Sequence, residues 1–284
     1  MRKALHGSGV ARSANALRPP LKWAGGKRWL VPRLRELWAP FAHRRLVEPF
    51  CGGLAVALGL RPVTALLSDI NPHTINFYKQ LQAGLRVTIE MRNERELYLA
   101  HRAEFNHLIS GRSKHTKKTA SLFYFLNRTG FNGLCRFNKS GQFNVPFGKH
   151  TTINYLRDFE PYRSLLASWQ FACGDFSRVG LNPGDFVYAD PPYDATFANY
   201  AAGGFDWVQQ QQLAQWLSEH DGPVVASNQA TERVLALYES LGFDLITLHG
   251  PRTISRTGDR TPALEVLGAR GLSAHALASL QRAA

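Results

Sequence analysis

The 284-residue sequence is poor in cysteine, in acidic residues and in long apolar runs, and each shortage excludes a class of protein. Its three cysteines, Cys51, Cys135 and Cys173, form no CxxC pair, which excludes a disulfide framework and is typical of a reducing cytosol. Ten histidines without HExxH or HxE…PCxxC spacing give no basis for a metal site. No apolar run approaches the length of a membrane span, and residues 1–18 lack the apolar core of a signal peptide. The sequence therefore predicts a cytoplasmic protein without a metal or a membrane anchor, and a disordered basic arm over residues 1–18.

Positive charge is what the sequence has in excess. It contains 34 Lys and Arg against 21 Asp and Glu, which gives a formal net charge of +13. Residues 86–150 alone contain twelve Lys and Arg against four Asp and Glu, a net charge of +8. Such a concentration favours a face that binds a polyanion such as nucleic acid. A solvated basic surface without a partner is the alternative.

The motif that best indicates a reaction is Asp190-Pro191-Pro192-Tyr193. The apolar run before it, residues 186–189, predicts a buried strand of a parallel sheet, and ligands of such sheets bind at the carboxyl edge. The Asp190 carboxylate and the Pro191 carbonyl suit the exocyclic amine of a nucleobase, because each can accept a hydrogen bond from one of its two N–H groups. The Tyr193 ring can stack on a base taken out of a helix. An ordinary turn with a buried tyrosine is the alternative.

A strand, a glycine turn and a helix over residues 45–60 predict the start of a nucleotide-binding unit. The next strand, residues 63–68, ends in Asp69, where a carboxylate can bond both ribose hydroxyls of an adenosine. The glycines do not follow G-x-G-x-x-G, and Glu48 would place negative charge against a pyrophosphate. The pattern favours an adenosine without phosphates, such as S-adenosylmethionine, whose cationic or amine groups Glu48 can meet. A dehydrogenase and a purely structural turn stay open.

Two further stretches have the composition of binding sites. Residues 22–27, Lys-Trp-Ala-Gly-Gly-Lys, place two lysines and an indole around a glycine pair, although a turn before a helix at residues 28–37 explains them equally well. Residues 127–148 combine Arg, Asn and aromatic residues with the turn signals Asn132-Gly133 and Ser140-Gly141, and predict a β-hairpin. Arg and Asn can read guanine and adenine in the major groove, and a Leu or Asn can wedge into a base step. A surface hairpin without a partner is the alternative.

The rest of the chain alternates between predicted helices and strands, which favours an α/β fold with a parallel sheet. A helical pattern runs from residue 71 to about 109 with a break at Gly84, and a polar loop follows at 111–118. Later helices are predicted at 206–220 and 231–240, and later strands at 169–173, 223–228, 243–248 and 263–267. Two irregular segments complete the prediction: a mobile lid at 194–205 and a polar loop at 254–260.

These motifs, in this order, resemble those of the Dam-type DNA adenine N6-methyltransferases, the D12 class or alpha group. The resemblance is carried by residues 22–27, 48–53, 68–71, 127–148 and 190–193 and runs from about residue 20 to 267. It implies a Rossmann-like, S-adenosylmethionine-dependent methyltransferase sheet with an inserted, mainly helical target-recognition domain that carries a β-hairpin. It places the catalytic domain at 19–74 and 154–270, the insertion at 75–153 and a tail at 271–284.

The resemblance also implies roles by position. The catalytic residues are Asp190, Pro191, Pro192 and Tyr193. S-adenosylmethionine, without a metal, contacts Trp23, Lys27, Glu48, Phe50, Cys51, Gly52, Gly53, Asp69, Ile70 and Asp175. Double-stranded DNA contacts Lys22, Arg128, Asn132, Leu134, Arg136, Asn138 and Pro146, with GATC as the expected site and its adenine as the target.

The expected reaction is direct transfer of a methyl group from a sulfonium to adenine N6, by an enzyme that we expect to be a monomer. Alternatives within the class are another DNA site or an RNA adenine. Methylation of a protein amide usually goes with Asn-Pro-Pro-Tyr, which Asp190 disfavours. A DNA-binding protein without catalysis is disfavoured by intact Gly52, Gly53, Asp69 and Asp190, and an oxidoreductase by the missing phosphate-binding glycines. Whether the gene is chromosomal, phage-borne or part of a restriction system is open.

Overall fold

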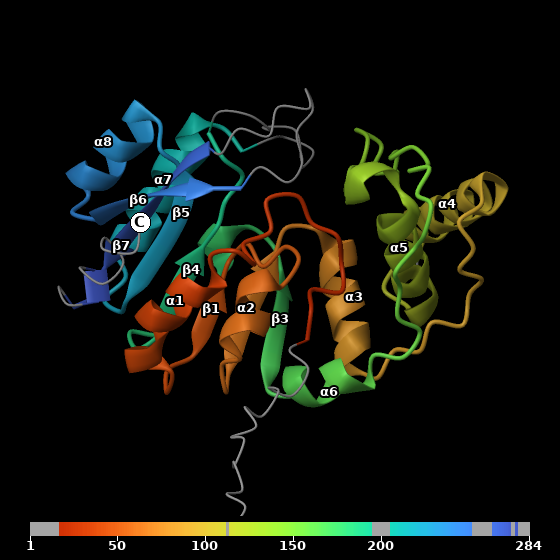
Figure 1. The fold of residues 1–284 in the computed structure, drawn as a ribbon, viewed down its shortest axis with the longest axis horizontal. Coiled ribbons are helices and arrows are strands. Elements are labelled where there is room, and N and C mark those ends of the chain that lie inside the picture. Colours follow the sequence, from red (N-terminus) through yellow and green to blue (C-terminus); the bar gives the residue numbers. More distant parts are fainter. Residues whose placement is uncertain (1–16, 112–113, 195–204, 252–262, 274–275, 278–284) are drawn as a thin grey trace, which may run out of the picture.

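A seven-stranded sheet forms the centre of the molecule (Figure 1). The computed structural model describes residues 17–111, 114–194, 205–251, 263–273 and 276–277. The strands are β1 Leu46–Glu48, β2 Ala65–Asp69, β3 Trp169–Cys173, β4 Phe186–Ala189, β5 Val224–Gln229, β6 Asp244–Gly250 and β7 Ala263–Arg270. Their order is β3-β2-β1-β4-β5-β7-β6; the first five are parallel, and β7 is antiparallel to both its neighbours. The predicted α/β class with a Rossmann-like sheet is confirmed.

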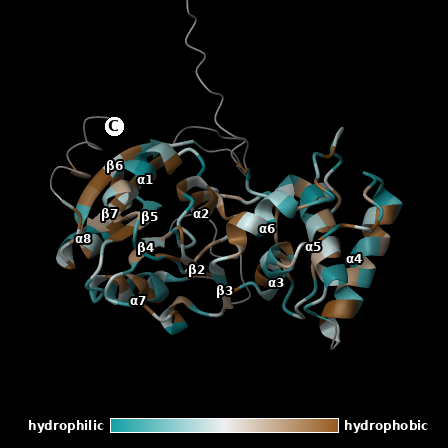
Figure 2. Cartoon of the chain, turned by 90° about the horizontal axis from the view of Figure 1, so that it is seen from below, coloured by the Kyte–Doolittle hydropathy of each residue, from teal (hydrophilic) through white to brown (hydrophobic). Residues whose placement is uncertain are grey.

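Helices cover both faces of this sheet. They are α1 Val31–Trp38, η1 Ala39–Phe41, α2 Ala55–Leu60, α3 Pro72–Gln82, α6 Glu160–Leu166, η3 Phe176–Arg178, α7 Trp207–Ser218 and α8 Glu232–Ser240. Phe186 and Tyr188 of β4 belong to the core that contains α1, α2 and α3, whereas Val187 and Ala189 belong to the core that contains α7 and α8. Because both faces of β4 are covered, its sequence is continuously apolar. The helices carry hydrophobic and hydrophilic residues together (Figure 2).

An insertion between β2 and β3 adds α4 Arg95–Ser110, α5 Lys117–Thr129 and η2 Phe131–Gly133 beside α3 (Figure 1). Aromatic rings join it to α3: Phe77 stacks on Tyr124 with ring centroids 5.4 Å apart. The Asn106 side chain of α4 donates to the carbonyl of Phe143 at 3.1 Å and accepts from its N–H at 2.8 Å. The loop after α5 is thereby fixed to the helices. The domain limits at 75 and 153 stay a prediction.

Several predicted boundaries were wrong. The helical pattern at 71–109 is two helices, because Gly84, with φ +77°, follows the end of α3 and residues 83–94 are not helical. The helix predicted from residue 28 begins at Val31, and α5 begins inside the loop predicted at 111–118. Antiparallel pairing within the predicted hairpin at 127–148 occurs in two places: Gly130 pairs with Phe147 at its base, and Phe137 pairs with Phe143 in the tip at residues 136–144.

Some predictions fall on residues outside this description. They are nearly all of the arm at 1–18, most of the lid at 194–205, the whole loop at 254–260 and most of the tail at 271–284. In the described part of the chain, no helix is long and apolar enough to cross a membrane. Among the same residues, no group of three or more His, Cys, Asp and Glu is placed to hold a metal ion.

Candidate active site

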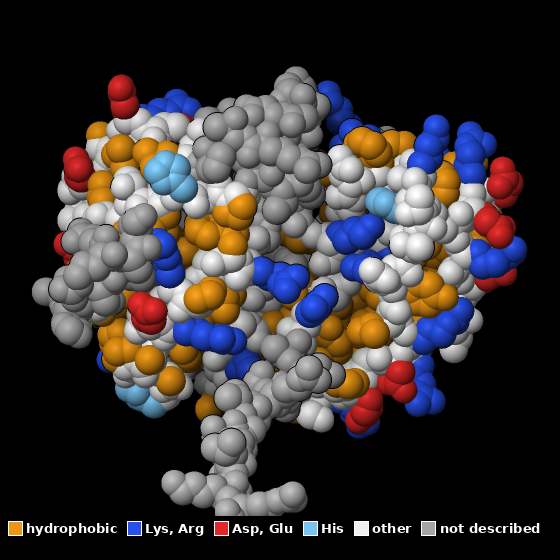
Figure 3. Space-filling view, viewed as in Figure 1, with side chains coloured by type: hydrophobic (Ala, Val, Ile, Leu, Met, Phe, Trp, Pro, Cys, Tyr) orange, Lys and Arg blue, Asp and Glu red, His pale blue; other side chains and the backbone are white. Residues whose placement is uncertain are grey.

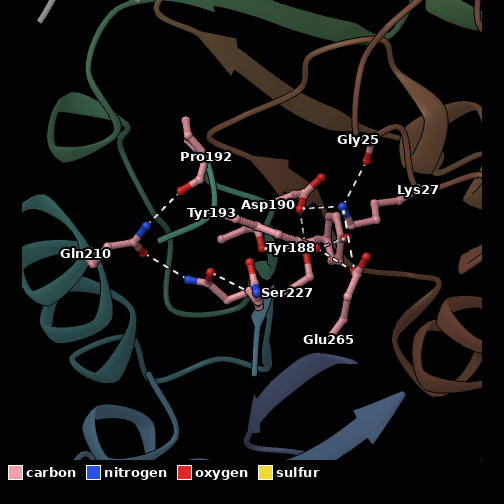
Figure 4. Close-up of polar contacts among 12 residues, drawn as sticks. Gly25, Lys27, Tyr188, Asp190, Pro192, Tyr193, Gln210, Ser227 and Glu265 are labelled. Atoms are coloured by element: carbon pink, nitrogen blue, oxygen red, sulfur yellow. Dashed lines mark hydrogen bonds and ion pairs between the residues drawn. The ribbon is translucent and has the colours of Figure 1, made fainter. Parts of the chain in front are cut away.

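Asp190 lies directly after β4, at the carboxyl edge of the parallel strands (Figure 4). Its Oδ1 atom accepts a hydrogen bond from Ser227 Oγ of β5 at 2.7 Å and lies 3.0 Å from Lys27 Nζ. The Lys27 side chain is only 4% exposed, so this ion pair is screened little by water. No described residue bonds Oδ2 of Asp190. One carboxylate oxygen is therefore held by the protein and the other is available to a ligand.

The two prolines present a second acceptor beside this oxygen. Gln210 of α7 donates to the carbonyl of Pro192 at 2.7 Å, and Asn228 of β5 donates to the Gln210 amide oxygen at 2.9 Å. The Pro191 carbonyl accepts no hydrogen bond from the part of the chain described here, and a proline has no N–H that could compete for a ligand's acceptors. Asp190 Oδ2 and the Pro191 carbonyl are thus two acceptors on adjacent residues that no described residue uses, which suits a group with two N–H bonds.

Tyr193 lies beside these acceptors, and other side chains contact both its ring and its hydroxyl. Its OH donates to Glu265 Oε2 at 2.5 Å, and Lys27 Nζ lies 4.6 Å from the ring centroid. Burial, and then the nearby Asp190 and Glu265 carboxylates, raise the pKa of Tyr193 well above its usual value. The phenol therefore stays neutral and offers a flat ring, not a base.

A second cluster surrounds the glycine turn between β1 and α2. Asp69, at the end of β2, accepts from Gly52 N at 3.0 Å and from Asn71 N at 2.9 Å. A side-chain carbon added at Gly52, whose φ is +42°, would lie 2.6 Å from Trp23 Nε1, so this turn needs glycine for the indole to pack on it. Burial raises the pKa of Asp69 to about 6, although the two backbone donors oppose the shift.

Glu48 has the buried polar atom that best indicates ligand binding in this cluster. It is 3% exposed at the end of β1, and its Oε1 has no hydrogen-bond partner within the described residues. Burial, followed by repulsion from Asp190, raises the pKa of Glu48 well above its usual value. A buried oxygen with no donor is costly, and a cationic or amine-bearing ligand would relieve that cost. This orphan acceptor and the glycine turn fit the predicted S-adenosylmethionine.

The other predicted cofactor residues lie at the same sheet edge with differing accessibility. Cys51 is buried, and burial raises the pKa of its thiol. Ile70 is exposed, while the Phe50 ring packs 5.8 Å from the ring of Phe176. Asp175 accepts from Ser177 N and Oγ and so caps η3. Lys27 donates to the Gly25 carbonyl at 2.9 Å and pairs with Asp190, and its contact with the cofactor stays a prediction.

The predicted DNA-contacting residues divide into held and exposed side chains. Lys22 Nζ donates to the Arg128 carbonyl at 2.9 Å, and the Arg128 guanidinium donates to the Asn154 carbonyl. Arg136 Nε donates to Asn144 Oδ1 at 2.8 Å. Asn138 accepts from the backbone of the hairpin turn, Leu134 is half-buried, and Asn132 and Pro146 are exposed. Figure 3 shows Lys and Arg side chains over the part of the molecule that contains α4 and α5.

Three important residues were missed by reasoning from sequence: Asn127, Ser227 and Glu265. Ser227 belongs to a strand that was predicted to end in Ser-Asn, so its position at the sheet edge was available as a signal. Glu265 is an acid inside an apolar strand, which is itself unusual. Asn127 gave no signal apart from its place as the first residue of the predicted hairpin stretch.

Comparison with known proteins identifies the class. The sheet is Rossmann-like, and a family model described as D12 class N6 adenine-specific DNA methyltransferase matches residues 23–254. The chain belongs to this family, as the sequence motifs predicted. It is therefore a DNA adenine N6-methyltransferase.

Named relatives agree with this assignment. Retron Ec67 DNA adenine methylase of Escherichia coli is 35% identical over 264 residues, which cover 88% of this chain and 90% of the relative. DNA adenine methylase of Vibrio cholerae is 35% identical over 258 residues, or 84% of this chain and 90% of the relative. DNA N-6-adenine-methyltransferase of Escherichia phage P1 is 35% identical across 91% of this chain, which spans 36% of that longer relative.

Proposed function

We propose that the enzyme transfers the methyl group of S-adenosylmethionine to N6 of an adenine that is flipped out of duplex DNA, within the sequence GATC. The observation that carries this proposal is the pair of acceptors beside the ring of Tyr193, Asp190 Oδ2 and the Pro191 carbonyl, which accept no hydrogen bond from the described residues. A base within a duplex cannot reach atoms at the edge of a buried sheet, so its flipping is part of the proposal.

The chain's own groups prepare the amine for attack. The lone pair of an adenine amine is delocalised into the ring, and two acceptors on its N–H bonds favour a tetrahedral nitrogen that frees this pair. Lys27 and Ser227 fix Oδ1 of Asp190, so Oδ2 is turned toward the amine. Bound S-adenosylmethionine supplies an electrophilic methyl group whose leaving group is a neutral thioether. Because the amine attacks while nearly neutral, Asp190 orients it and takes up the surplus proton only after transfer.

The cofactor would be held by groups that the structure leaves ready for it. Asp69 keeps lone pairs for the two ribose hydroxyls while the backbone N–H groups of Gly52 and Asn71 fix its carboxylate. The unpaired Oε1 of Glu48 would meet a positive or amine-bearing part of the methionine moiety. The Trp23 indole on the glycine turn, together with Phe50, would provide apolar walls.

The site GATC comes from the resemblance by position. Lys22 and Arg136 would contact guanines, and Asn132, Leu134 and Pro146 would contact the central base pairs. The exposed positions of Asn132 and Pro146 support such contacts. Lys22 and Arg136 make hydrogen bonds within the protein, and hydrogen bonds to bases would have to replace them when DNA binds.

The test is methyl transfer to two matched duplexes, one with GATC and one with those four bases scrambled, read by mass spectrometry of the nucleosides. We expect N6-methyladenine only in the GATC duplex. Methylation of both duplexes, or only of the scrambled one, would keep the chemistry and refute the site. No methylated adenine in either duplex, with cofactor shown to bind, would favour another sequence or an RNA substrate.

A further inference from the structure

Glu265 of β7 holds the hydroxyl group of Tyr193 from across the sheet (Figure 4). The 2.5 Å bond joins residues 72 positions apart, and Glu265 is 8% exposed. We infer that Glu265 is a positioning residue for methyl transfer, which fixes the ring of Tyr193 against which the target adenine stacks. This inference rests on the proposed function, because it concerns the same flipped base.

The fold makes room for this carboxyl group. Glu265 pairs with Gln229 of β5 on one side and with Leu248 of β6 on the other, at the same sheet edge as Asp190. A side-chain carbon added at Gly250 of β6 would lie 2.3 Å from Glu265 Oε1, so the absence of a side chain there accommodates the carboxyl group. The next two residues, Val266 and Leu267, are fully buried core residues. An acid in such a strand costs stability, and its described partners are the Tyr193 hydroxyl, which donates to it, and Lys27 Nζ at 3.9 Å.

The geometry at Tyr193 explains why its hydroxyl needs an anchor. Lys27 Nζ lies 4.6 Å from the ring centroid, 3.0 Å from Asp190 Oδ1 and 3.9 Å from Glu265 Oε2. The ammonium therefore occupies one face of the ring, and an incoming base has only the other face. Without the bond to Glu265 the ring can turn about its side-chain torsions, and the base would lose its fixed distance from Asp190.

The experiment compares Glu265→Ala, Glu265→Met, Glu265→Gln and Tyr193→Phe in single-turnover methyl transfer to a GATC duplex with saturating S-adenosylmethionine. Ala and Met remove the acceptor, and we expect each to slow transfer by roughly 10- to 100-fold, the scale of a misplaced reacting group. Tyr193→Phe, which removes only the hydroxyl, should lose a similar factor. Gln keeps an acceptor and should stay within about threefold of the wild type.

Two further measurements separate positioning from a general structural role. In the double variant Glu265→Met/Tyr193→Phe the loss should not exceed that of the slower single variant, because both changes remove the same bond. The dissociation constants for DNA and S-adenosylmethionine should stay within about twofold. Glu239→Ala, at an exposed acid of α8, is the matched control and should leave the rate unchanged.

The inference is overturned if the two losses multiply in the double variant, or if Glu265→Met transfers at the wild-type rate. It is also overturned if Gln is as slow as Met, because the charge and not the hydrogen bond would then matter. Should Glu265→Ala fail to fold, Met and Gln decide the question, since their side chains are close to Glu in length. A wild-type enzyme that methylates no adenine would instead refute the proposed function.

Discussion

At the scale of single residues, the chemistry depends on which oxygen of Asp190 is free. Asp190→Ala removes the acceptor for the amine, so we expect it to abolish methylation while S-adenosylmethionine still binds. Ser227→Ala leaves Oδ1 held by Lys27 alone, and we expect about a tenfold slower rate, the equivalent of one hydrogen bond. Initial rates and calorimetric titration measure both effects.

The control for these variants is Ser240→Ala, which alters an exposed serine on α8 and should keep full activity. Wild-type turnover by Asp190→Ala would contradict its role as the acceptor. A Ser227→Ala enzyme with an unchanged rate would show that Lys27 orients the carboxylate without help.

The raised pKa of Asp69 predicts a pH dependence of cofactor binding. Burial puts this pKa at about 6, above the ordinary value of 3.8, so the ionised form is disfavoured in the folded protein. The contribution of Asp69 to the free energy of unfolding is therefore largest below pH 4 and falls as the pH rises to about 6. Binding of a ribose needs the ionised form, and we expect S-adenosylmethionine to bind about tenfold more weakly at pH 5 than at pH 7.5.

Calorimetry across this range checks the prediction. The pKa of Glu48 is also raised, so the titration is repeated in Glu48→Gln, where the change near pH 6 should remain. In Asp69→Asn we expect weak binding without that change. A dissociation constant that is level from pH 5 to pH 7.5 in the wild type would show that Asp69 does not bind the cofactor as an anion.

The sequence predicted where these carboxylates lie in the fold, but not their partners. Asp190 and Asp69 were predicted at the ends of strands and Glu48 near the end of another, and residues at such ends meet at one edge of a parallel sheet. Ser227 and Glu265 reach Asp190 and Tyr193 only because the strand order places β5 beside β4 and β7 beside β5. The strand order is a property of the folded sheet, and the spacing of residues along the chain does not predict it.

At the scale of elements, one buried amide joins the end of α5 to the segment at residues 22–27. Asn127, in the last turn of α5, is fully buried. Its Oδ1 accepts from Lys22 N at 2.8 Å, and its Nδ2 donates to the carbonyls of Lys22 at 2.8 Å and Gly133 at 3.4 Å. The same side chain thus fixes Lys22 and the turn at Gly133 relative to α5.

Asn127→Asp should therefore lower the free energy of unfolding by about 2–4 kcal/mol, because a carboxylate would face two carbonyl oxygens and leave both without a donor. Chemical denaturation of the purified enzyme measures this difference. Asn132→Asp, at an exposed position, is the control and should change stability by less than about 0.5 kcal/mol. Equal stabilities of the two variants would show that the bridge contributes little.

The partly wrong hairpin shows the limit of local turn signals. Asn132 and Gly133 do adopt the positive φ values, 52° and 63°, that an Asn-Gly turn requires. They belong to η2, however, and lie at the base of the hairpin, where Gly130 pairs with Phe147 and Phe131 N donates to the Pro146 carbonyl. Ser140-Gly141 alone forms the hairpin turn. Asn132-Gly133 and Ser140-Gly141 both form turns, as predicted. The end of α5, which the dipeptides do not indicate, decides which segments these turns connect.

At the scale of the whole molecule, the excess positive charge and the position of the insertion point to one DNA-binding side. The hairpin at 136–144 extends from the insertion, and its turn carries the exposed Lys139. Helix α6 precedes β3, so it lies at the amino edge of the sheet, away from Asp190 (Figure 1). Exposed positive charges on the hairpin and on α6 therefore allow a matched comparison of the insertion with the amino edge of the sheet.

We predict that DNA affinity falls linearly in a plot of log Kd against log salt, and that Lys139→Ala reduces the slope by about one unit, the effect of one lost phosphate contact. Arg163→Ala, which removes an exposed and equally charged residue from α6, should leave the slope unchanged. Fluorescence anisotropy of a labelled GATC duplex between about 50 and 200 mM salt gives both slopes. Because each variant removes one positive charge, a general effect of net charge would lower the two slopes alike, whereas direct phosphate contact lowers only that of Lys139→Ala. A slope reduced by Arg163→Ala instead would place the DNA at the amino edge of the sheet and contradict the proposed site at Asp190.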